Sequence, residues 1–107
     1  MNNERKDEKS REIVRALAAD FVQRESNQTS MITVTDVEMG DQGRNATIYF
    51  TVLPQDKEAV VTEFLIRKRV EFQQYARDHS RLGRLPLFDF ALDRGEKHRQ
   101  RIDELIR

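Results

Sequence analysis

One stretch near the end of the chain decides the fold: Arg81-Leu82-Gly83-Arg84-Leu85-Pro86-Leu87-Phe88-Asp89-Phe90-Ala91-Leu92-Asp93. It begins as the basic end of a helix, which Pro86 stops because its ring removes a hydrogen-bond donor and disfavours helical geometry in the preceding residue. The apolar residues 87–92 predict a strand. Asp93 then opens a short amphipathic helix over residues 96–106, whose predicted buried side chains are Ile102, Leu105 and Ile106.

Upstream of this stretch, hydrophobic periodicity predicts two helices and two strands. Apolar residues at helical spacing from Ile13 to Val22 predict a first helix, preceded by polar residues 1–9 that we expect to be frayed. The β-branched run 31–39 and the alternating run 46–53 predict two strands, joined by a Gly-containing turn into an antiparallel hairpin. A long helix follows over about residues 57–80, with the core stripe Val61, Phe64, Leu65, Phe72, Tyr75 and Ala76.

The element order is therefore α-β-β-α-β-α. It predicts an α+β fold in which one three-stranded sheet is covered on one face by helices. A length of 107 residues favours a single domain, residues 1–107. Because the chain has no cysteine, no signal-peptide pattern and no apolar run long enough to cross a bilayer, we expect a soluble, cytoplasmic protein.

Few residues offer chemistry. The two histidines, His79 and His98, fall in different predicted helices and lack the spacing of metal ligands. Asp89 and Asp93 fit the roles of a strand residue and a helix cap better than those of an acid–base pair. No nucleotide-binding or hydrolase motif is present. We therefore expect no enzymatic activity, no metal or other cofactor and no small-molecule substrate.

Charge is the informative signal. The 19 basic and 19 acidic residues cancel over the chain, but residues 67–84 carry a local net charge of +4. Arg77, Arg81 and Arg84, spaced by four and three, share one face if the helix persists that far. Guanidinium groups can bind phosphates through paired hydrogen bonds, whereas the alternative is a solvated charged face. The predicted RNA-binding residues are Arg67, Lys68, Arg69, Arg77, Arg81 and Arg84.

These segments together resemble the ribosome-binding factor A family, of which the chain looks like a divergent member. The resemblance rests on order and spacing: a helix ending in Val22-Gln23-Arg24-Glu25, the strand 31–39, the strand Arg44 to Val52, the Arg81 to Pro86 turn with Phe88-Asp89-Phe90 and Asp93, and the closing Arg101-Ile102 with Leu105. Two motifs depart from the family. Lys68-Arg69-Val70 stands where the long helix usually kinks at Ala-x-Gly, and Asn27-Gln28-Thr29 replaces Asp-Pro-Arg.

The resemblance implies a type-II KH-like fold and a non-enzymatic factor that binds small-subunit rRNA during late maturation. Its expected partners are the small ribosomal subunit and its rRNA, with no membrane, and the protein is expected to be a monomer. Whether the long helix kinks at residues 68–70 stays open. The alternative function is a KH-like protein–protein interaction module that has lost RNA binding.

Overall fold

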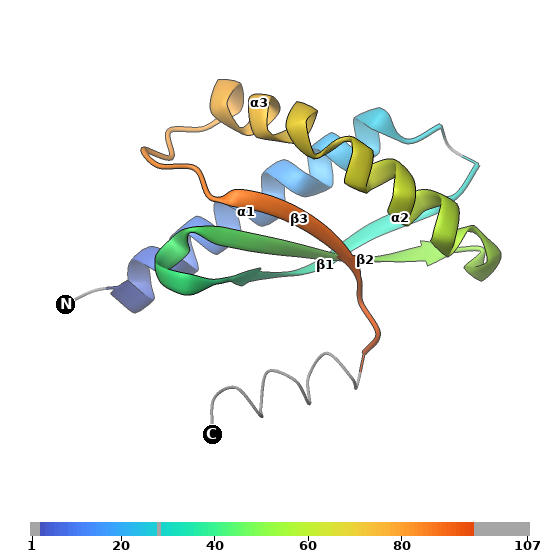
Figure 1. Cartoon of the computed structure of the whole chain (residues 1–107), viewed down its shortest axis with the longest axis horizontal. Helices are drawn as coiled ribbons and strands as arrows, with labels where there is room; N and C mark the ends of the chain where they lie inside the picture. The colour runs from blue at the N-terminus through green and yellow to red at the C-terminus, as the bar shows by residue number, and fades with distance from the viewer. Residues whose placement is uncertain (1–2, 28, 96–107) are drawn as a thin grey trace.

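The computed structural model describes residues 3–27 and 29–95, with side chains from residue 8 onward. Within this part of the chain, three α-helices lie on one face of a three-stranded sheet (Figure 1). They are α1 (Asn3–Glu25), α2 (Glu58–Arg67) and α3 (Arg69–His79). The predicted final helix, residues 96–106, lies outside the described residues.

The sheet has the strand order β1-β2-β3. β1 (Met31–Met39) and β2 (Asn45–Leu53) form the predicted antiparallel hairpin. β3 (Leu87–Leu92) pairs in parallel with β2, with Phe50 opposite Leu92. Because β2 and β3 run in the same direction, the chain must cross over between them, and α2 and α3 make that connection as predicted.

Local geometry closes the hairpin. A short 3-10 turn, Asp41–Gly43, joins the strands, and Gly43 has φ of 75°. Glycine adopts this left-handed backbone conformation readily because it has no Cβ. On β1 the register shifts between Val34 and Asp36, which marks an irregularity in the ladder.

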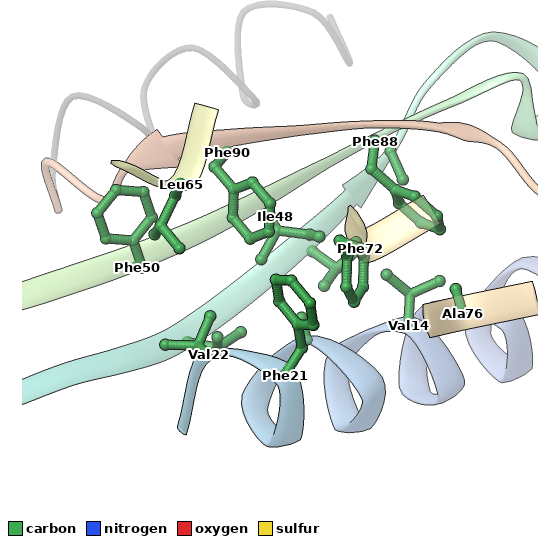
Figure 2. Close-up of a cluster of buried hydrophobic side chains, with 14 of the residues drawn as sticks. Val14, Phe21, Val22, Ile48, Phe50, Leu65, Phe72, Ala76, Phe88 and Phe90 are labelled. Atoms are coloured by element: carbon green, nitrogen blue, oxygen red, sulfur yellow. The ribbon is translucent and has the colours of Figure 1, made fainter. Parts of the chain in front are cut away.

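The core lies between the helices and the covered face of the sheet (Figure 2). Alternate residues of β2 are buried, as predicted: Ala46, Ile48, Phe50 and Val52. The first helix contributes Val14, Ala18, Phe21 and Val22. Phe72 is the central ring of this core, with its centroid 5.2 Å from that of Phe21 and 4.7 Å from that of Phe88. It therefore links α1, α3 and β3.

The long helix predicted over residues 57–80 is divided in two at Lys68. This residue leaves helical geometry, with φ of −89° and ψ of 5°. Backbone hydrogen bonds of Lys68 itself are retained on both sides of the bend. The Lys68 N–H donates to the carbonyls of Phe64 and Leu65, both at 3.1 Å, and the Lys68 carbonyl accepts from the Phe72 N–H at 2.9 Å. The helix thus kinks at the position left open by the sequence, without a glycine.

α1 begins at Asn3, earlier than the apolar periodicity from Ile13 indicates, because Glu, Arg and Lys are good helix formers. α3 ends at His79, within one residue of the end predicted for the long helix and well before Pro86. Ser80 ends it, because its backbone is extended and its hydroxyl donates to the Ala76 carbonyl at 2.6 Å.

Candidate nucleic-acid interface

The first three predicted cations, Arg67, Lys68 and Arg69, surround the bend between α2 and α3, and we call them the junction group. Lys68 is the most constrained of them. Its Nζ lies 3.1 Å from Glu71 Oε2 and 3.3 Å from Glu25 Oε1. The hydrogen bonds that the Lys68 ammonium donates to these carboxylates, first Glu71 and then Glu25, raise the pKa of Lys68 above 10.5. The cation therefore connects the bend to the end of α1.

Arg69 connects the same bend to the sheet. Its Nε donates to the carbonyl of Ile66 at 3.0 Å, and its Nη1 lies 3.5 Å from Asp89 Oδ1 on β3. Arg67 is exposed at the end of α2. Two of the three junction cations thus face carboxylates, so the positive field at the bend is largely neutralised.

Arg81 and Arg84, which we call the loop pair, lie in the loop between α3 and β3. Both are exposed, and both line an open recess beside Met39 and Gln42 of the hairpin. Among the described side chains, no carboxylate lies within ion-pair distance of either arginine. The recess therefore presents two guanidinium groups that pair with none of the carboxylates whose side chains the structure describes.

The six predicted residues do not form one helical face. Because α3 ends at His79, Arg81 and Arg84 do not continue the stripe of Arg77, and the condition for their shared helical face is not met. The helix also separates the junction group from the loop pair by roughly 15 Å, at about 1.5 Å per residue. Arg77 lies between the two groups, with its Nη1 3.3 Å from Gln74 Oε1.

The sequence pattern missed a polar cluster on the seam between α1 and α3. It assigned Tyr75 only to the core stripe, but the Tyr75 hydroxyl donates to Asp20 and the Arg24 guanidinium lies 5.3 Å from the centre of the Tyr75 ring. The hydrogen bond to Asp20, followed by burial, raises the pKa of Tyr75 above 10.0. The spacing of Asp20 and Arg24 by four was the available signal, since such residues share one helix face.

The acidic residues considered for catalysis have structural partners. Asp93 accepts from the Thr35 hydroxyl at 2.6 Å and from the Gly95 N–H at 2.8 Å. Asp89 accepts from Arg69 and from the Phe90 N–H. Across the described residues, no group of three or more His, Asp or Glu side chains is arranged to hold a metal ion. In that same part of the chain, no helix is long and apolar enough to cross a membrane.

Comparisons with known proteins agree with this fold. A family model described as ribosome-binding factor A matches residues 5–106. The crystal structure of ribosome-binding factor A from Thermus thermophilus superimposes with a TM-score of 0.63 at 19% identity, covering 74% of this chain and 86% of that one. No curated protein sequence matches the chain significantly.

A second solved structure gives the same result. The solution structure of a Thermotoga maritima protein, proposed to be a ribosome binding factor A, superimposes with a TM-score of 0.61 at 25% identity. The match covers 78% of this chain and 82% of that one. The predicted α+β, KH-like fold class is confirmed.

Proposed function

Because the chain belongs to the ribosome-binding factor A family, whose members are non-catalytic binding factors, we propose that it is a non-enzymatic assembly factor that binds small-subunit rRNA. In this proposal it assists late maturation of the small subunit in the cytoplasm, as a monomer that uses one RNA-binding domain. The observation that carries the proposal is the loop pair, two exposed arginines on a recess without described counter-charges.

Electrostatics explains why this pair matters more than the total charge. RNA binding draws its affinity largely from cations that displace the counterions of phosphates, and a cation already paired with a carboxylate contributes less. Arg77 and Arg67 add exposed cations on the same bent helix. Lys68 and Arg69 take part only where a phosphate competes with their carboxylate partners.

The proposal is tested by measuring affinity for small-subunit particles in rising salt. We expect the combined change of Arg77, Arg81 and Arg84 to Glu to weaken binding more than tenfold and to flatten its salt dependence. Lys57→Glu is the control for a single charge reversal outside the proposed face, because Lys57 is an exposed residue near the start of α2. Unchanged binding by the triple variant would overturn the proposed face.

The alternative is a KH-like protein–protein interaction module that has lost RNA binding. The neutralised junction group favours it, as does Val70, an apolar side chain that is 80% exposed beside the bend. Co-sedimentation with a defined protein partner that survives nuclease treatment would support this alternative. Loss of co-sedimentation after nuclease treatment would support RNA binding instead.

A further inference from the structure

Three rings are aligned along α3: Phe72, Tyr75 and His79. The Phe72 and Tyr75 rings are 6.5 Å apart and inclined by 21°, and the Tyr75 and His79 rings are 4.1 Å apart and inclined by 20°. Burial decreases along this column, since Phe72 is fully buried, Tyr75 is half-buried and His79 is exposed. The column therefore begins in the core and ends at an accessible ring on the last residue of the helix.

Both outer rings are held in place. His79 Nδ1 lies 2.9 Å from the Tyr75 carbonyl oxygen, so this nitrogen carries the hydrogen and donates it. Tyr75 in turn is fixed by Asp20 and Arg24 of α1. An exposed side chain held in one orientation loses little further conformational entropy when a ligand stacks on it.

The surroundings indicate the chemistry of that ligand. Arg81, a member of the loop pair, follows His79 by two residues, just after the end of α3. Arg77 precedes His79 by two residues on the helix, and side chains at that spacing point to different sides. An exposed flat ring followed closely in the chain by a guanidinium group matches one nucleotide, which has a base to stack and a phosphate to pair. The base must be unpaired, because bases within a duplex are stacked on one another.

We propose that the outer face of His79 stacks on an unpaired nucleobase of the bound RNA, whose adjacent phosphate contacts Arg81. This inference rests on the proposed RNA-binding function and adds to it a contact with a base. Stacking on an aromatic side chain tolerates any base, so the contact selects single-stranded over duplex RNA without reading sequence.

Two variants separate stacking from charge and hydrogen bonding. His79→Ala removes the ring, and His79→Phe keeps a ring of similar size without its nitrogens. We expect His79→Ala to weaken binding to small-subunit particles by about 5- to 100-fold, and His79→Phe to restore most of the affinity. A single-stranded RNA decamer containing 2-aminopurine should lose fluorescence on the wild-type protein and on His79→Phe, but not on His79→Ala.

Arg81→Gln is the control for the phosphate contact. It is expected to reduce the salt dependence of binding and to leave the fluorescence change of the bound decamer intact. If the wild-type chain binds particles and His79→Ala binds equally well, the stacking contact is overturned while the proposed function stands. If the wild-type chain binds neither particles nor the decamer, the proposed function fails and the stacking contact fails with it.

Discussion

The junction group and the loop pair contain the same kinds of residue and differ in what surrounds them. At the junction, Lys68 reaches two carboxylates and connects the bend to α1. Arg69 reaches a carboxylate and a backbone carbonyl and connects the bend to β3. In the loop, Arg81 and Arg84 line a recess, and no carboxylate among the side chains that the structure describes pairs with either of them. We infer that the junction cations mainly stabilise the bend, whereas the loop arginines are available to a ligand.

The largest effect is expected from the residue that supports both regions. Phe72→Ala leaves a cavity between α1, α3 and β3, and we expect it to lower the free energy of unfolding by about 3–5 kcal/mol. Urea denaturation measures this change. Val70→Ala is the control on the same helix, because that side chain is 80% exposed, and it should change stability by less than about 0.5 kcal/mol. Equal effects of the two variants would contradict the packing described.

The next largest effect is on RNA binding, in which the loop pair and the junction group should differ. Replacing both Arg81 and Arg84 with Gln should lower the slope of log affinity against log salt by about 1.5 units, because two phosphate contacts are lost. Replacing both Lys68 and Arg69 with Gln should change that slope by much less. Fluorescence titration of small-subunit particles at several salt concentrations gives both slopes. If the Lys68 and Arg69 variant showed the larger change in slope, the RNA-binding site would lie at the bend instead.

A smaller effect separates the groups by stability. Lys68→Met removes both ion pairs at the bend but keeps the long side chain, so we expect a decrease in Tm of a few degrees at most. Arg84→Met, which breaks no described ion pair, should leave Tm unchanged. Thermal melting monitored by circular dichroism compares the two variants. A larger decrease in Tm for Arg84→Met would show that the loop arginine, and not the junction lysine, stabilises the fold.

The smallest effect concerns the seam that supports the end of α3. The hydrogen bond to Asp20 raises the pKa of Tyr75 above 10.0. A raised folded-state pKa means that this stabilisation is present below the unfolded value and is lost as pH rises through the folded value. Spectrophotometric titration of Tyr49→Phe, which leaves one tyrosine, should give the raised value. Adding Asp20→Asn should return it towards 10.0.

Most of the fold was predictable because it depends on periodic apolar residues. The alternation in β2 and the stripe of α1 follow directly from which side chains reach the core. The end of the long helix near Ser80 was also predicted, but its cause was not, since the Ser80 hydroxyl ends α3 by competing with the backbone. Pro86 is the stronger sequence signal for a helix end, but it lies several residues beyond His79, where α3 ends.

The candidate site was predictable in residue type but not in arrangement. Counting charges between residues 67 and 84 treats all six cations as equivalent. The carboxylates that neutralise part of this charge include Glu25 on α1 and Asp89 on β3, which are far from the bend in sequence. Only the packing of α1 and β3 around the bend brings those partners into contact with Lys68 and Arg69.

The bend at Lys68 has a further consequence for dynamics. Because the amide hydrogens of Lys68 and Phe72 are both hydrogen-bonded, they should exchange with deuterated solvent as slowly as those inside α3. We infer that the angle between the two helices is held by these bonds and by the ion pairs of Lys68 and Arg69. A partner that binds across the bend then uses less of its binding energy to order this segment.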